Sequence, residues 1–567
     1  MSKEKNLIEQ QEAGKKRTRT QTCPYLDTIQ RKVLDFDFER SCSVSLQSGP
    51  HIYGCLVCGR FFRGKGRQTP AFIHSVDEGH SVFVHLTKGT FWCLPDDYEV
   101  IDPSLMDISA ALNPTYRLED TQKLDQNHDL SRDLYTKRYL PGYVGLNNLK
   151  KTDYINATIQ ALAQVRPLRD FFLQAGVSIP LPSKETNQYA HLARCFGELM
   201  RKIWSDKRFR SNVDPHEMIQ AISAASSKRF HVGKQAEASA FLSWLLNCLH
   251  IGVGGTRKAG SSIIHKTFQG VVELTIRQRK KVLDVDLNEE LDDRVGSEDE
   301  EEFEKKEEER LKKLEEANKE TEIDEQTIET KFLHLTLDMP EKPLFKDDEG
   351  GLVIPQEPLF NVLQKFNGEK FCDTVQGGVP QKRRYRLRKL PNYLVLHLAR
   401  FKRNNFYNEK NPTIVTFPVK NLDLSQYVFP KEGEAEVPTE EQIRKMNTKE
   451  LKKFLKKYGK LNIVENAVEK SEIVDAVIDF VKTKLMCLLL DKYDLIANIC
   501  HDSPSDVGKE GKRDPLEEGS YRCHVQHRAS SQWYEIQDLH VQETMPQLIG
   551  LSESYLLIFE RKGMADS

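Results

Sequence analysis

Hydrophobic residues follow two spacings along this chain, and each spacing predicts a different element. Ile155, Ile159 and Leu162 recur every three to four residues, which is typical of an amphipathic helix. The aromatic and β-branched run at 81–86 and the alternating apolar stretch at 390–401 predict strands. The chain is therefore expected to contain both helices and strands.

Three segments lack the apolar pattern of a core. Residues 1–22 are polar and basic, which predicts a disordered tail whose lysines and arginines resemble a short nuclear-import run. Residues 106–139 are predicted to be a linker between a cysteine-rich module at 23–105 and a larger domain at 140–563. Residues 284–329 form an insertion of mixed glutamates and lysines that suits a solvated spacer. An acidic element that binds a partner is the alternative for that insertion.

A second insertion, residues 438–482, predicts two helices. Thr448 is placed to cap the first helix, whose inward side carries Leu451 and Leu455. The second helix follows at 473–481 with its own apolar residues. The outward side of the first helix carries a candidate nucleic-acid-binding face: Lys449, Lys452, Lys453, Lys456 and Lys457. The pair resembles a SAP-like hairpin that contacts nucleic acid, and an ordinary solvated helical hairpin is the alternative.

Composition narrows the classes of protein that fit. At 567 residues the chain is long enough for about two to four domains and a sizeable core. Its net charge of −2 gives no overall preference for nucleic acid. The chain begins with polar, basic residues and has no long apolar run, so we expect an intracellular protein without a membrane partner. Eleven unevenly spaced cysteines indicate reduced thiols with a metal site rather than a disulfide framework.

The cysteine-rich module carries a candidate zinc site. Two thiols and two imidazoles stand at spacings that a tetrahedral zinc ion accepts: Cys55, Cys58, His74 and His80. Ordinary buried cysteines and histidines, or a zinc finger that binds nucleic acid, are the alternatives. A second ion held by Cys42, His85 and Cys93 is a further alternative.

Two boxes in the larger domain resemble those of the ubiquitin-specific proteases. The segment 145–162 resembles their opening box, with Asp153 where the family has its nucleophilic cysteine. A later segment resembles their Gly-His-Tyr box, with Ser520 in place of the general-base histidine. The resemblance assigns an oxyanion-stabilising amide to Asn148 and an orienting acid to Asp538. It implies an α+β fold, in which a small zinc-binding α/β module precedes a papain-like domain of fingers, palm and thumb with two insertions.

These replacements remove the chemistry of a cysteine protease. A carboxylate at Asp153 is a poor nucleophile toward an amide, and the neutral hydroxyl of Ser520 cannot act as a base. We therefore expect Asp153 to serve as the cap of the helix that follows it. Cys500 and His501 are a rescue pair to consider, but neighbouring residues in a strand point to opposite faces.

The cysteine-rich module itself resembles the zinc-finger ubiquitin-binding domain found beside some deubiquitinases. Arg60 matches an arginine with which relatives hold the C-terminal tail of ubiquitin, but Leu94 stands near the place of a tyrosine that helps them. The departure puts ubiquitin binding in doubt. The basic residues of the same loop are alternative contacts for an acidic protein or a phosphate backbone: Arg60, Arg63, Lys65 and Arg67.

The order of the two domains, together with both replacements, resembles the catalytically inert ubiquitin-specific protease homologues of the spliceosomal tri-snRNP. This resemblance implies a nuclear, non-catalytic scaffold that contacts tri-snRNP proteins, supports pre-mRNA splicing and is a candidate to touch RNA. A ubiquitin-binding reader and a residual deubiquitinase are the two alternatives.

Overall fold

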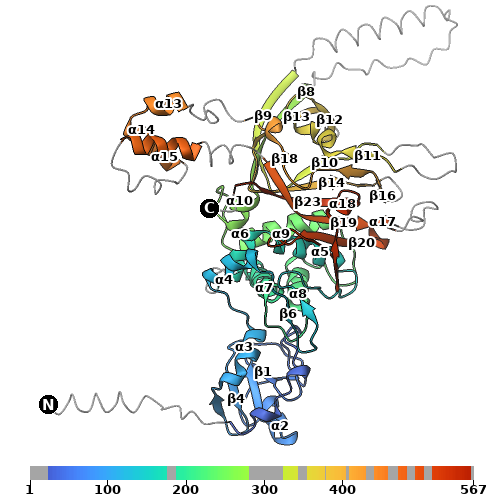
Figure 1. Ribbon diagram of the computed structural model, residues 1–567. Coiled ribbons are helices and arrows are strands. Elements are labelled where there is room, and N and C mark those ends of the chain that lie inside the picture. Colours follow the sequence, from blue (N-terminus) through green and yellow to red (C-terminus); the bar gives the residue numbers. More distant parts are fainter. Residues whose placement is uncertain are drawn as a thin grey trace, which may run out of the picture. The chain divides into compact units, whose positions relative to one another are not determined.

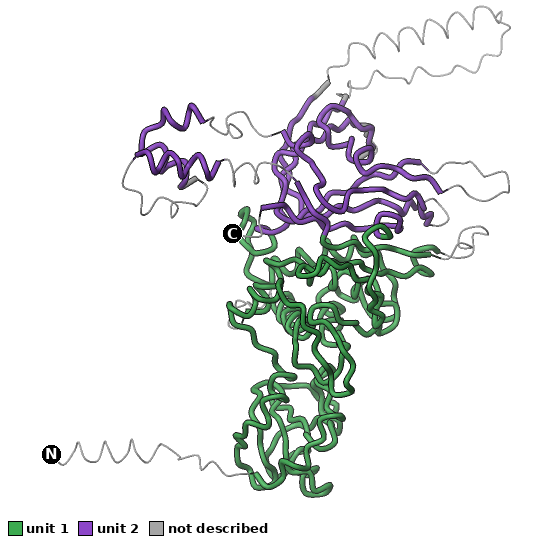
Figure 2. The backbone as a smooth tube through the Cα atoms, in the orientation of Figure 1, with its two compact units in different colours: residues 1–264, 496–548 green, residues 265–495, 549–567 purple. Residues whose placement is uncertain are grey.

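The structure is a computed structural model, and it describes residues 23–174, 187–279, 323–341, 354–376, 379–403, 408–429, 440–457, 470–481, 492–503 and 514–563. The predicted tail at 1–22 and most of the first insertion lie outside these residues. The chain divides into two compact units, Met1–Ile264 with Ile496–Leu548 and His265–Leu495 with Ile549–Ser567 (Figure 2). Helices and strands occur in both units, which confirms the predicted α+β class.

The cysteine-rich module is a five-stranded antiparallel sheet with one helix on it (Figure 1). Its strand order is β2-β1-β3-β4-β5. The strands are β1 Ile52–Cys55, β2 Phe61–Arg63, β3 Val82–His85, β4 Phe91–Cys93 and β5 Tyr98–Val100, and the helix is α2 Pro70–Asp77. Because side chains alternate along a strand, β3 places Val82 and Val84 in one core and Phe83 in another. The strand predicted at 81–86 is confirmed.

The segment predicted as a linker is largely folded. It contains α3 Met106–Leu112, α4 Leu118–Lys123 and two short strands, β6 Ser131–Arg132 and β7 Arg138–Tyr139. The linker prediction was wrong because Ile108 and Leu112, one turn apart on α3, are buried in the core of the zinc module.

The first unit also holds the helix that follows Asp153. This helix, α5 Asp153–Ala163, packs against α6, α9 and strand β20. Its residues are all buried, including the predicted apolar positions, so it is a central helix rather than an amphipathic surface one. The elements around it are α6 Arg166–Leu173, α7 Asn187–Trp204, α8 His216–Ala225, α9 Ala238–Gly252, β20 Ser520–Gln526, β21 Trp533–Gln537 and β22 His540–Thr544.

The second unit is built around two groups of strands. β12 Cys372–Gln376, β13 Val379–Lys389, β8 Gly270–Arg279 and β9 Ile323–Phe332 form a four-stranded sheet. β14 Tyr393–Ala399, at the centre of the strand predicted at 390–401, lies between β10 Leu335–Asp338 and β23 Ser554–Arg561. Two elements, α10 Ile263–Phe268 and β19 Lys492–Asp502, cross the boundary between the units. The smaller elements of the second unit are β11 Gln356–Pro358, α12 Leu359–Val362, β15 Phe401–Arg403, β16 Asn408–Lys410, β17 Ile414–Thr416 and β18 Leu422–Asp423.

The first insertion ends earlier in the structure than predicted. Residues 323–329, assigned to the charged insertion 284–329, belong to β9 and pair with β8 from Arg279↔Ile323 onward. The prediction failed because residues 325–330 are all exposed, so this part of β9 lacks the alternating buried face by which a strand is found in a sequence.

The second insertion forms three helices with a core of their own. They are α13 Glu440–Lys445, α14 Thr448–Lys457 and α15 Lys470–Asp479, and the predicted turn at Gly459 lies outside the described residues. Leu451 and Leu455 are fully buried in that core, as predicted. The prediction that Thr448 caps α14 was wrong. Asn447 occupies that position instead, since its Oδ1 accepts the Glu450 N–H at 2.9 Å while Glu450 Oε2 accepts the Asn447 N–H at 2.9 Å.

Candidate metal centre and degenerate catalytic site

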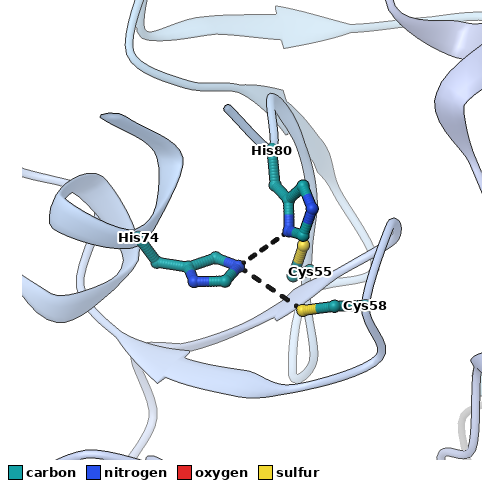
Figure 3. Close-up of side chains that lie close together, drawn as sticks. All are labelled: Cys55, Cys58, His74 and His80. Atoms are coloured by element: carbon teal, nitrogen blue, oxygen red, sulfur yellow. Dashed lines mark hydrogen bonds between the residues drawn. The ribbon is translucent and has the colours of Figure 1, made fainter. Parts of the chain in front are cut away.

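The four predicted metal ligands converge in the zinc module (Figure 3). Cys58 Sγ lies 3.4 Å from His74 Nε2, which lies 3.0 Å from His80 Nδ1. All four ligand atoms lie within 4.8 Å of one another. Bond lengths to zinc require ligand atoms roughly 3.3–3.8 Å apart in a tetrahedron. The donor set and its spacing therefore fit a zinc ion.

Local backbone geometry brings these ligands together. Cys55 ends β1, and the chain then turns so that the N–H of Gly59 donates to the carbonyl of Cys55 at 2.9 Å. Gly59 has a φ of +77°, and a Cβ there would approach the carbonyl oxygen of Val33 to 2.5 Å. Only glycine suits that position, so the Cys-x-x-Cys-Gly turn is set by sterics as well as by metal chemistry. His74 is supplied by α2.

The two thiols are electrostatically prepared to bind a cation. The hydrogen bond between them raises the pKa of Cys55, and the same bond lowers the pKa of Cys58 to about 4. A proton is therefore held by Cys55 while Cys58 is a thiolate at neutral pH. A metal ion replaces that proton when it binds both sulfurs.

The alternative second ion site does not assemble. Cys42 Sγ accepts the N–H of Ser45 at 3.5 Å, and Cys93 lies beside Cys23, whereas His85 Nδ1 accepts two backbone N–H groups. Across the part of the chain that the structure describes, a single cluster has metal-ligand spacing, and it is the Cys55 cluster.

Asp153, in the position of the nucleophile, is buried and held by hydrogen bonds. Its carboxylate accepts the N–H of Tyr521 at 2.7 Å and the side-chain amide of Gln235 at 3.1 Å, and the residue is 5% exposed. Burial raises the pKa of Asp153, and these two hydrogen bonds offset part of that rise. The prediction that Asp153 caps α5 was wrong. Thr152 precedes the helix at the capping position, while Asp153 is its first residue and turns toward β20.

The other residues predicted for the catalytic site, Asn148 and Asp538, are hydrogen-bonded to each other. The side-chain amide of Asn148 donates to Asp538 at 2.9 Å, and that of Asn156 donates to the other oxygen of Asp538 at 2.8 Å. Asn148 Oδ1 in turn accepts from Thr152. The amide of Asn148 was predicted to stabilise an oxyanion, and the carboxylate of Asp538 was predicted to orient an imidazole. In the structure these two groups are hydrogen-bonded to each other and join two loops. Ser520, at the start of β20, accepts a hydrogen bond from Gln537 at 3.3 Å.

A buried thiol–imidazole pair lies in the same unit as Asp153. Cys500 Sγ lies 3.6 Å from His524 Nδ1, and His524 Nε2 lies 3.1 Å from Glu535 Oε2. Cys500 is 0% exposed, so a protein substrate has no access to its sulfur. His501 contacts Tyr521 on the other side of the strand, which agrees with the expectation that Cys500 and His501 point to opposite faces.

The region expected to hold a ubiquitin tail is altered as well. Leu94 is fully buried in the module core and offers no hydroxyl group. Lys65 Nζ stands 3.4 Å from the centre of the Trp92 ring and is paired with Asp97. The chain's own lysine therefore covers an aromatic surface in the zinc module.

Substitution of Asp153 is expected to alter stability in a pH-dependent way. Asp153→Ala leaves the buried N–H of Tyr521 without an acceptor, at a cost of about 1–3 kcal/mol of unfolding free energy. Asp153→Asn costs less, because its side-chain oxygen still accepts that N–H.

The pH dependence follows from the raised pKa of Asp153. Between the ordinary aspartate pKa of 3.8 and the raised pKa of Asp153 in the folded protein, the folded state binds more protons than the unfolded state. The unmodified protein therefore loses stability relative to Asp153→Asn as pH rises through that window. Urea unfolding from pH 3.5 to pH 7 measures this difference, and an unmodified protein that gains stability relative to Asp153→Asn as pH rises would contradict the burial of an ionising carboxyl.

Comparison with known proteins assigns the family. The model for ubiquitin carboxyl-terminal hydrolase matches residues 144–559, and the model for the zinc finger in ubiquitin hydrolases and other proteins matches residues 42–105. The chain therefore belongs to the ubiquitin carboxyl-terminal hydrolase family, with a zinc-finger domain before the hydrolase fold. The resemblance expected from the two boxes is confirmed at the level of the family.

Several relatives span nearly the whole chain. Ubiquitin carboxyl-terminal hydrolase 39 of Mus musculus is 40% identical over 96% of this chain and 81% of its own length. A probable mRNA-splicing protein of Schizosaccharomyces pombe, ubp10, is 33% identical over 95% of this chain and 88% of its own. A solved structure of an essential yeast splicing factor shares the fold, with a TM-score of 0.61 and 22% identity over 95% of this chain and all of that chain. Among the described residues, no helix is long and apolar enough to cross a bilayer.

Proposed function

We propose that this chain is a non-catalytic scaffold of pre-mRNA splicing, in which a ubiquitin-hydrolase fold binds partners instead of cleaving ubiquitin. The observation that carries the proposal is the state of Asp153, a buried carboxyl tied to Tyr521 and Gln235 at the nucleophile position. Such a group has neither the nucleophilicity nor the freedom to attack an isopeptide bond. Support for splicing comes from relatives that bear splicing names.

The partners in this proposal are proteins of the tri-snRNP, and the place of action is the nucleus. The two alternatives lack comparable support. A residual deubiquitinase needs an accessible nucleophile, whereas Cys500 is fully buried. A ubiquitin reader of the kind that the zinc module resembles uses a tyrosine near the place of Leu94, which is buried and has no hydroxyl group.

Zinc is the proposed resident metal, held by Cys55, Cys58, His74 and His80. A closed set of two thiolates and two imidazoles gives a structural site, because no ligand position remains open for a substrate. The ion would join the end of β1 to α2, which secures the fold of a small domain.

Affinity purification from nuclear extract tests the proposed partnership. The tagged full chain is expected to recover tri-snRNP proteins together with their small RNAs, and Asp153→Ala is expected to recover the same set. Recovery of ubiquitin conjugates in place of these components would support the reader, and recovery of neither would remove the proposal.

The second insertion is proposed to add affinity for RNA through α14. Lys449, Lys452 and Lys453 are exposed, and they lie opposite the buried leucines of that helix; Lys456 and Lys457 belong to α14, but their side chains lie outside the described residues. Three lysines that neutralise phosphates contribute a salt-dependent term to binding.

Charge reversal of these three lysines is expected to weaken binding of a labelled RNA duplex about tenfold and to reduce the salt dependence by about two units of slope. The control is Lys470→Glu, an exposed lysine on α15 of the same insertion. Equal losses in the control and the triple variant would show that α14 has no special role.

A further inference from the structure

The zinc module contains a second feature that the metal site does not use. A pocket of about 740 Å³ opens between the start of α2 and the ends of the strands. Its walls carry basic, aromatic and small polar residues: Ser45, His51, Tyr53, Arg63, Lys65, Gln68, Thr69, His85, Lys88 and Trp92. A pocket of this size holds a small ligand or one unit of a polymer.

The pocket is electropositive. Arg63, Lys65 and Lys88 line it, and no carboxylate is found among the described residues that form its walls. Arg63 and Lys88 are exposed, whereas Lys65 is already paired with Asp97 outside the wall. Two cations therefore remain at the pocket for an anionic ligand.

His85 supplies an unused hydrogen-bond donor to the same pocket. Its Nδ1 accepts the backbone N–H groups of Thr87 at 3.3 Å and Lys88 at 3.2 Å, so this nitrogen carries no proton. Burial chiefly, and then the charges of Lys88 and His51, lower the pKa of His85, so the ring is neutral at pH 7. The proton of the neutral ring is therefore on Nε2.

That Nε2–H is buried without a hydrogen-bond partner, on a residue that is only 3% exposed. Buried donors in folded proteins are nearly always paired with an acceptor, water or ligand. His85 is one of the residues that line the positive pocket, so an unpaired donor on its ring indicates a place for an acceptor oxygen. Neither the zinc site nor the degenerate catalytic site uses this group.

We propose that this pocket binds single-stranded RNA, with a phosphate held by Arg63, Lys88 and the Nε2–H of His85. A base would lie against the exposed imidazole of His51, because Lys65 covers a face of the Trp92 ring. Aromatic and imidazole rings beside cations are the usual means of holding unpaired nucleotides, since every base offers a ring face.

An acidic peptide explains the cations but not the exposed ring of His51. A protein tail that ends in a free carboxylate remains an outcome of the test, although Lys65 occupies a face of Trp92. RNA accounts for the charges, the exposed ring of His51 and the unpaired donor of His85 together. This inference does not rest on the proposed splicing role, because it depends on the zinc module alone.

The test measures binding of a fluorescein-labelled oligouridylate to the full chain by anisotropy. Arg63→Glu with Lys88→Glu is expected to raise the Kd at least about tenfold. Arg67→Glu is the matched control, since Arg67 is exposed on the same loop but does not line the pocket. His85→Ala is expected to raise the Kd about tenfold through loss of the donor. Zinc content and circular dichroism establish that each variant is folded.

A photo-crosslink places the ligand independently of these substitutions. An oligonucleotide that contains 4-thiouridine is expected to label the segment around His51 or Trp92. An equal loss of affinity in Arg67→Glu would overturn the proposal, as would an unchanged Kd in the Arg63→Glu, Lys88→Glu variant. Displacement of the RNA probe by free ubiquitin or by an acidic peptide at matched concentration would assign the pocket to a protein ligand instead.

Discussion

Cys58→Ala is expected to release the metal from the zinc module and to unfold that module. Removal of one of four ligands leaves a site that no longer closes around the ion, and the binding free energy of a structural zinc is on the order of 10 kcal/mol. The module has two small cores that meet at the sheet, so the metal bonds are a large share of its stability.

Metal analysis of the full chain measures this effect, with about one zinc expected per unmodified chain. Cys42→Ala is the control, because Cys42 is a buried thiol of the same module but is not a ligand. A Cys58→Ala protein that retains its zinc and its circular dichroism spectrum would remove the metal site.

The unmodified protein is expected to have no isopeptidase activity, and Asp153→Cys alone is not expected to create any. A thiol at position 153 would lie against the N–H of Tyr521, and the preceding residue, Ser520, can neither accept its proton nor pass one to the leaving amine. The loss of a nucleophile and its base together lowers turnover by a factor on the order of 10⁶ in a well-studied hydrolase triad.

Asp153→Cys combined with Ser520→His is expected to give weak turnover of a ubiquitin–fluorophore substrate. The gain is limited because Asp538, which would orient the new imidazole, is already bound by Asn148 and Asn156. Asp153→Cys with Ser520→Ala is the matched control without a base. Cleavage by the unmodified protein that disappears in Asp153→Ala would show that the site is catalytic after all.

Local sequence patterns predicted those parts of the structure that short-range rules determine. The Cys-x-x-Cys-Gly turn and the paired histidines indicated one cluster, and the structure places those side chains together. The buried positions of α14 and the centre of β14 also follow from simple spacing. Such features depend on residues that are close in sequence, so one amino-acid sequence is enough to predict them.

The contacts that define the degenerate site were not predictable in this way. Asp153 is held by Gln235 and by the N–H of Tyr521, which are 82 and 368 residues away. Local rules favoured a helix cap for Asp153 because they contain no information on β20. The open donor of His85 was missed for a related reason, since its tautomer depends on a turn whose geometry the sequence does not give.

Depletion and add-back in a nuclear extract test the central proposal most directly. An extract depleted of this protein is expected to lose splicing of a pre-mRNA substrate, and the unmodified chain and Asp153→Ala are expected to restore it equally. Equal restoration would show that splicing needs the fold and not a reaction at position 153. An extract that splices normally after depletion, or a folded Asp153→Ala protein that fails to restore splicing, would contradict a non-catalytic scaffold.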